Sequence, residues 1–252
     1  MNRRVWFEGR AERKEMEVGP KVVLLLRDPE GFGQAISDAF HPNPTASVTE
    51  ESFELSLERY GIRNCKASGK VRHFLDQHGQ HEVSVLLMEY YESPILACAF
   101  NEVLAELAGQ KSSSMPTIVA PFFVASSKLK WDSKSATKFD SKGSLYGIQI
   151  GPETDISKAI IARTQKAPPS LQIHHEPLAC LLQLVRVLNL PTLVLIGQRG
   201  QRISDKEELE ILYEIGELLA NTCKVNFSRG KITWKPTKKS KDEQEPWRAL
   251  YG

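Results

Sequence analysis

Short apolar runs and segments of helical periodicity alternate along the chain from residue 21 onward. Residues 21–26 and 81–89 are nearly continuous apolar runs, which are typical of strands covered on both faces. Residues 53–57 instead alternate apolar and polar side chains, which predicts a strand with one face in solvent. Covered and half-exposed strands together predict a sheet of mixed direction.

Apolar residues three or four positions apart predict helices near residues 32–40, 95–107, 178–188 and 209–219. Ser93-Pro94 predicts a helix start with serine as the N-cap, and Ser204 to Glu207 matches a capping box. The helix after Glu176 runs into the apolar stretch Thr192–Gly197. This succession of helix and buried strand predicts an α/β layer.

Two further segments predict strands. Residues 117–124 are strand-like, but Pro121 indicates an edge strand or a bulge. Residues 231–234 predict a last short strand before the chain becomes strongly polar.

Changes of composition suggest where the folded domain begins and ends. Residues 1–20 are charged and end in Gly19-Pro20, which predicts a flexible N-terminal arm. Residues 126–143 are rich in lysine and serine, which predicts an exposed loop within a domain spanning residues 21–234. Residues 235–252 then form a predicted flexible tail.

Composition and charge argue against several classes of partner. The 252 residues have a formal net charge of +2, so no general field draws the protein to nucleic acid or to an anionic membrane. The first residues lack the apolar stretch of a signal peptide, and no run approaches the roughly 20 apolar residues that span a bilayer. We therefore expect neither secretion nor membrane insertion.

Cysteine usage favours a reducing compartment. Cys65, Cys98, Cys180 and Cys223 are far apart in the sequence and form no CxxC pair. Cys98 and Cys180 lie in apolar helical patterns, which predicts buried reduced thiols with no metal site. This usage suits the cytosol or the nucleus.

Candidate catalytic residues are few. Arg199 and Arg202 follow a buried strand, where open α/β sheets place ligands, but the glycine spacing of a phosphate-binding loop is absent. His175 precedes a helix without a partner at catalytic spacing. We therefore predict no enzyme, no catalytic residue and no cofactor. A phosphorylase-like α/β enzyme that uses these three residues is the alternative.

Two lysine-rich segments raise a third possible function, that of a nucleic-acid accessory protein. They gather in residues 128–142 and 235–241. The second group is followed at once by acidic residues and has no interleaved aromatic residues, which favours a solvated tail.

The C-terminal sequence Leu250-Tyr251-Gly252 has the pattern hydrophobic residue, tyrosine, any residue, free carboxylate. Such an end offers an apolar side chain for a groove, an aromatic ring with a hydroxyl, and a carboxylate that can pair with a lysine or with backbone amides. We therefore predict a protein-docking element here, presented by the polar tail.

The chain resembles the proteasome assembly chaperone 1 family in two stretches. One is the leucine-rich helix that ends in Leu190-Pro191-Thr192-Leu193-Val194-Leu195-Ile196. The other is Leu250-Tyr251-Gly252, which is similar to the tail of proteasome-binding factors.

This resemblance implies a chaperone of 20S core-particle assembly that forms a heterodimer with proteasome assembly chaperone 2 and binds the ring of proteasome α subunits. Leu250 and Tyr251 would enter the pocket between neighbouring α subunits, and the Gly252 carboxylate would pair with a lysine there. The expected fold class is α/β, with a central mixed, largely buried sheet flanked by helices in a phosphorylase-like three-layer arrangement, and with a flexible C-terminal tail. The expected location is the cytoplasm, together with the nucleus.

Overall fold

The structure is a computed structural model that describes residues 16–44, 46–109, 115–130, 145–199 and 204–234. The predicted tail, 235–252, lies outside these residues. Of the arm predicted over residues 1–20, only the last five residues are described. They lie against the domain, because Met16 is 4% exposed and its N–H donates to Oε1 of Glu106 at 3.2 Å.

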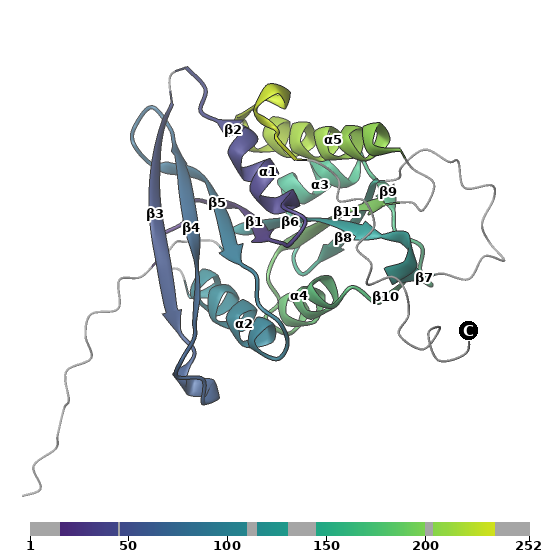
Figure 1. The fold of residues 1–252 in the computed structure, drawn as a ribbon. Helices are drawn as coiled ribbons and strands as arrows, with labels where there is room; N and C mark the ends of the chain where they lie inside the picture. Colours follow the sequence, from purple (N-terminus) through teal and green to yellow (C-terminus); the bar gives the residue numbers. More distant parts are fainter. Residues whose placement is uncertain (1–15, 45, 110–114, 131–144, 200–203, 235–252) are drawn as a thin grey trace, which may run out of the picture.

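Strands and helices alternate along the chain (Figure 1). The strands are β1 (Lys21–Arg27), β2 (Phe40–His41), β3 (Ser47–Ser56), β4 (Lys66–Leu75), β5 (His81–Glu89), β6 (Thr117–Ala125), β7 (Leu129–Lys130), β8 (Leu145–Ile150), β9 (Gln165–Lys166), β10 (Gln172–Ile173), β11 (Thr192–Arg199) and β12 (Asn226–Phe227). The helices are α1 (Phe32–Ala39), α2 (Ile95–Ala108), α3 (Asp155–Ile161), α4 (Glu176–Val187) and α5 (Asp205–Cys223), with single turns η1 (Glu58–Tyr60), η2 (Ser126–Lys128) and η4 (Arg229–Lys231).

The main sheet of the described residues has eight strands in the order β3-β4-β5-β1-β6-β11-β8-β9. The central strands β5, β1, β6 and β11 are parallel to their neighbours in that group. The β3–β4, β4–β5 and β11–β8 pairs are antiparallel. The predicted sheet of mixed direction is confirmed.

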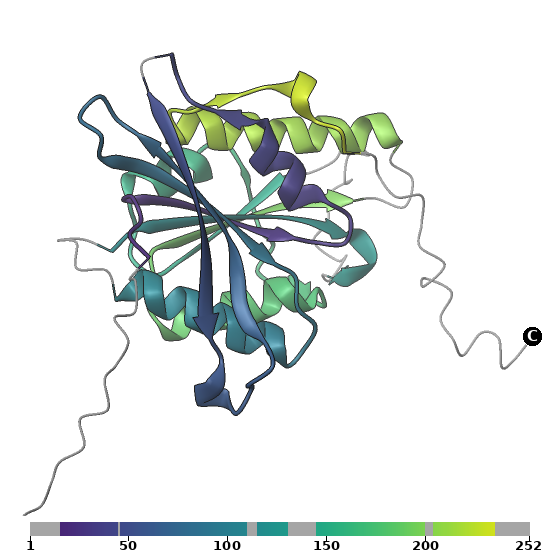
Figure 2. The same ribbon diagram turned by 60° about the vertical axis from the view of Figure 1, so that its left-hand side comes forward.

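Helices cover both faces of this sheet (Figures 1 and 2), because its central strands are apolar on both sides. Along β1, Val22, Leu24 and Leu26 join the core under α2 and α4, whereas Val23 and Leu25 join the core under α1, α3 and α5. The predicted three-layer α/β class is therefore confirmed.

The prediction that Pro121 marks an edge or a bulge is wrong, since β6 lies between β1 and β11 in regular register. Strand N–H groups point alternately to the two neighbouring strands. The N–H of Thr117 donates to Pro20 and that of Ile118 to Pro191, so the nitrogen of Pro121 is on the β1 side. Pairing with β1 ends at Val119, and the missing N–H of Pro121 therefore costs no sheet hydrogen bond.

Of the two predicted helix starts, one is confirmed and the other is wrong. The capping box is confirmed, because Ser204 Oγ accepts the N–H of Glu207 at 3.4 Å and Glu207 Oε2 accepts the N–H of Ser204 at 2.8 Å. The prediction for α2 is wrong: Pro94 is the N-cap residue, and Ser93 Oγ donates to Glu176 Oε1 at the start of α4. The hydroxyl of Ser93 therefore links two helices.

The loop predicted over residues 126–143 is ordered in its first five residues. They form η2 and β7, in which Leu129 is 4% exposed and pairs with Ile173 of β10. Residues 131–143 lie outside the described residues. The strand predicted over residues 231–234 is absent, since η4 ends at Lys231 and no strand follows it in the described chain.

Candidate functional site

The last described residues before the predicted tail lie at the carboxyl ends of the central strands. Trp234, the last described residue, is 8% exposed and its Nε1–H donates to the carbonyl oxygen of Glu30 at 2.7 Å. Its ring contacts Phe123 edge-on, with centroids 5.6 Å apart. We call Glu30, Phe123 and Trp234 the tail anchor. The predicted docking residues Leu250, Tyr251 and Gly252 lie beyond it, outside the described residues.

The loop between β1 and α1 places Glu30 in the tail anchor. The Asp28 carboxylate accepts the N–H groups of Glu30, Phe32 and Gly33 at 3.0, 3.2 and 2.8 Å. Gly33 is required by close approach, because a Cβ built there would lie 1.8 Å from the carbonyl oxygen of Leu26. One carboxylate and one glycine thus hold the loop tightly against the end of β1.

Arg199, at the end of β11, connects the tail anchor to α5. Its Nη1 lies 3.0 Å from Glu30 Oε1, and its Nε lies 2.7 Å from Glu208 Oε1. Burial raises the pKa of both carboxyls, against the lowering effect of Arg199. The guanidinium is therefore engaged by two carboxylates, and a phosphate would have to displace them. Arg202 lies outside the described residues.

His175 serves as the N-cap of α4. Its Nδ1 accepts the N–H of Leu178 at 3.4 Å, and its ring packs edge-on against Phe122. Burial, with a smaller effect of Lys128, lowers the pKa of His175 to about 4. Neutral and hydrogen-bonded at Nδ1, His175 has a structural role. Both described candidates of the enzyme alternative, Arg199 and His175, are thus engaged in contacts within the protein.

Replacing His175 with asparagine is expected to remove a pH dependence of stability. A histidine whose folded pKa is about 4 and whose unfolded pKa is about 6.5 loses stability as the pH falls through that interval, because only the unfolded state takes up the proton. Asparagine also caps helices but does not titrate. Urea unfolding at pH 7 and pH 4.5 should show a smaller decline for His175→Asn than for wild type. An equal decline would contradict this assignment.

A Ser-His-Glu chain that sequence reasoning missed lies across β3, β4 and β5. Ser84 Oγ is 2.9 Å from His73 Nδ1, and His73 Nε2 is 3.3 Å from Glu51 Oε1. This order of residues is that of a nucleophilic triad, although in such a triad Nε2 faces the serine and Nδ1 faces the carboxylate. Ser84, however, is fully buried, and its Oγ accepts the N–H of Gly19 at 2.8 Å. Ser84 therefore holds Gly19 against the sheet, and its buried hydroxyl is not accessible to a substrate.

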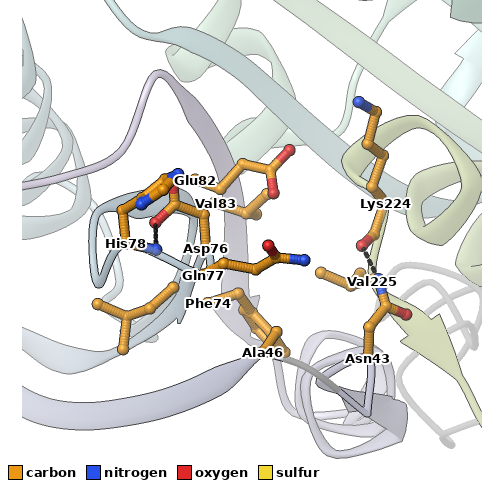
Figure 3. Close-up of a pocket in the computed structure, with 11 residues that line it drawn as sticks. Asn43, Ala46, Phe74, Asp76, Gln77, His78, Glu82, Val83, Lys224 and Val225 are labelled. Atoms are coloured by element: carbon orange, nitrogen blue, oxygen red, sulfur yellow. Dashed lines mark hydrogen bonds between the residues drawn. The ribbon is translucent and has the colours of Figure 1, made fainter.

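A hollow of about 320 Å³ lies between the β4–β5 turn and the end of α5 (Figure 3). Its polar groups are largely paired within the protein. The Asp76 carboxylate accepts the N–H groups of His78 and Gln80, Glu82 pairs with Lys21 at 3.0 Å, and Asn43 Nδ2 donates to the carbonyl oxygen of Lys224. The carboxylates of Asp76 and Glu82 are therefore both held by contacts within the protein.

The four cysteines are free thiols. Cys223 is buried, which raises the pKa of its thiol to about 12. Cys98 and Cys180 are only partly buried, contrary to the prediction, although both pack against the core under α2 and α4. Within the described ranges, no group of three or more histidine, cysteine, aspartate or glutamate residues could hold a metal ion.

No helix among the described residues is long and apolar enough to cross a membrane.

Comparison with known proteins gives a family and a fold. Residues 16–252 match the family model described as "Domain of unknown function (DUF7894)". None of the curated proteins matches the sequence. A solved structure of a protein of unknown function from Mycobacterium tuberculosis is 10% identical over 91% of this chain and 81% of that chain, with a TM-score of 0.50. That structure shows that the fold recurs.

Two other solved structures are similar at slightly lower TM-scores. A protein of unknown function from Thermoplasma acidophilum is 14% identical over 94% of this chain and 91% of that chain, with a TM-score of 0.49. PbaA from Pyrococcus furiosus, described as an archaeal homolog of proteasome-assembly chaperone, is 13% identical over 94% of this chain and 89% of that chain, with a TM-score of 0.47.

Proposed function

This chain belongs to the DUF7894 family, and from that premise we propose that it is a non-enzymatic, protein-binding chaperone that promotes assembly of the 20S proteasome core particle. The observation that carries the proposal is the sequence Leu250-Tyr251-Gly252 behind a polar leader. In this proposal Gly252 ends the chain with a free carboxylate.

The proposed docking site is a pocket between neighbouring proteasome α subunits. Leu250 would fill an apolar groove, Tyr251 would bury its ring while its hydroxyl stays hydrogen-bonded, and the Gly252 carboxylate would pair with a lysine. Buried aromatic anchors of this kind contribute most of the binding energy at many interfaces. A partner chaperone of the proteasome assembly chaperone 2 type would complete a heterodimer, in the cytoplasm and the nucleus.

The tail anchor supports this proposal physically. Trp234 is buried at a defined place on the domain, so residues 235–252 start from a fixed base. A flexible chain of that length spans about 20 Å, which lets its end search for a pocket while the domain contacts another surface. Two weak contacts joined by such a tether bind more tightly than either contact alone.

Blocking the C-terminal carboxylate tests the proposal. The tagged full-length chain is used to capture recombinant α subunits, and the captured subunits are quantified. Adding two alanines after Gly252, or replacing Tyr251 with alanine, is expected to weaken capture by about tenfold or more, because the carboxylate or the aromatic anchor is lost.

Ser240→Ala is the matched control, since it changes the same tail but leaves its last three residues intact. It should capture α subunits like wild type. Undiminished capture by the extended chain would overturn the docking role.

A further inference from the structure

Two cysteines lie near the starts of the neighbouring helices α2 and α4. These helices pack side by side on one face of the sheet (Figures 1 and 2), and Cα atoms of the two helices approach within 8 Å. Cys98 belongs to α2 and Cys180 to α4, and both are partly buried against the same core. Neither residue is fully buried, so small solutes can approach them.

A hydrogen bond fixes how the two helices are aligned. Ser93 Oγ, two residues before the start of α2, donates to Oε1 of Glu176, the first residue of α4. Because α2 leads into β6 and α4 leads into the parallel strand β11, the two helices run in the same direction. Cys98 is the fourth residue of α2 and Cys180 the fifth of α4. Each therefore lies about 5 Å along its helix from the joined ends.

The ionisation of one thiol affects the other. Burial raises the pKa of Cys180, and Glu176 and then Cys98 add to the rise. An effect of Cys98 on this pKa requires the two thiols to be near each other, as the alignment of the helices indicates. Both cysteines are free thiols, so the pair is in its reduced form.

We propose that Cys98 and Cys180 are a redox-sensitive pair that forms a disulfide between α2 and α4 within one chain. With hydrogen peroxide as the oxidant, one thiolate attacks a peroxide oxygen, the O–O bond breaks and hydroxide leaves, which gives a sulfenic acid. The second thiolate attacks that sulfur, the S–S bond forms and a second hydroxide leaves. The hydroxides take up the two thiol protons, so two thiols and one peroxide become one disulfide and two waters.

The order of attack follows from the surroundings of Cys180. Because its pKa is raised, its reactive thiolate is scarce at neutral pH, and Glu176 repels that thiolate. Cys98 is therefore expected to attack the peroxide first, and Cys180 then attacks the sulfenic acid. Dimedone should trap sulfenic acid at Cys98 in Cys180→Ala, and about fivefold less at Cys180 in Cys98→Ala. Equal trapping in the two variants would contradict this order.

Oxidation of the full chain tests the pair itself. Wild type is treated with a small molar excess of hydrogen peroxide, digested without reductant and analysed by mass spectrometry. The expected product joins Cys98 to Cys180 within one chain, with two of the four thiols lost, and dithiothreitol should restore both. The melting temperature of the oxidised chain should rise by about 5 °C or more, because the bond closes a long segment of the chain.

Three alanine variants complete the test, which concerns the domain and is independent of docking by the tail. Cys98→Ala and Cys180→Ala should each abolish the product and the rise in melting temperature. Cys65→Ala is the matched control, since Cys65 is also partly buried against this core but precedes β4. It should behave like wild type. A wild-type chain that keeps all four thiols, joins Cys65 to Cys98, or forms only bonds between chains would overturn the proposal.

Discussion

Replacing Arg199 with methionine is expected to lower the free energy of unfolding by about 3–5 kcal/mol, because it leaves a buried carboxylate without its counter-ion. Glu208 is 4% exposed, and its Oε1 lies 2.7 Å from Arg199 Nε. Glu30 loses the same partner. Methionine retains part of the apolar volume, so the loss is mainly one of charge compensation.

The pH dependence of this loss identifies its cause. Burial raises the pKa of Glu208, and Arg199 opposes that rise, so the pKa should rise further in Arg199→Met. A carboxyl whose folded pKa lies above its unfolded value contributes stability below the unfolded pKa and loses it as the pH rises through the folded pKa. The deficit of the variant, measured by urea unfolding, should therefore be largest at neutral pH and shrink toward pH 4.

Arg229→Met is the matched control. Arg229 also contacts two carboxylates, Glu217 at 2.6 Å and Glu210 at 3.6 Å, but all three side chains are about half exposed. Exposed ion pairs contribute at most about 1 kcal/mol, so this substitution should cost little. Adding Glu208→Gln to Arg199→Met should recover part of the lost stability. Similar losses for the two arginine variants would show that burial of Glu208 is unimportant.

Replacing Gly33 with alanine is expected to destabilise the fold by more than about 4 kcal/mol, because the new methyl group would overlap backbone. Its Cβ would lie 1.8 Å from the carbonyl oxygen of Leu26, an atom of β1 with little freedom to move. The loop would have to shift, which breaks the Asp28 hydrogen bonds and displaces Glu30 from Trp234. Thermal unfolding and limited proteolysis after Trp234 would measure both effects.

Gly230→Ala is the matched control for this substitution. A Cβ at Gly230 has only Ser228 Oγ nearby, at 4.0 Å, and the backbone there does not have a positive φ. Its stability should stay within about 0.5 kcal/mol of wild type. A Gly33→Ala variant as stable as Gly230→Ala would contradict the tight loop.

Several elements could be predicted because their signals are local. The strands of residues 21–27 and 81–89 followed from apolar runs, and the start of α5 followed from the spacing of Ser204 and Glu207. Pro121 misled the prediction for β6, because a proline's effect in a sheet depends on which neighbour its nitrogen faces and how far that neighbour extends.

The contacts that build the candidate site could not be predicted from spacing. Glu30, Arg199 and Trp234 are distant in the chain, and only the order of β1, β6 and β11 brings them together. The Ser84, His73 and Glu51 contacts likewise depend on the register of three strands, in which a shift by one residue would reverse each side chain. Tryptophan at position 234 carried no local sign that its ring would be buried.

The amino-acid sequence by itself determined the α/β class, the covered central strands and the chemistry of the Leu250-Tyr251-Gly252 end, because periodicity and residue type are properties of neighbouring positions. The tertiary structure alone decided that Arg199 and His175 are engaged within the protein and that Trp234 is buried beside Glu30 and Phe123. These features depend on which residues, distant in the sequence, pack together and exclude water. Strand order and register determine that packing.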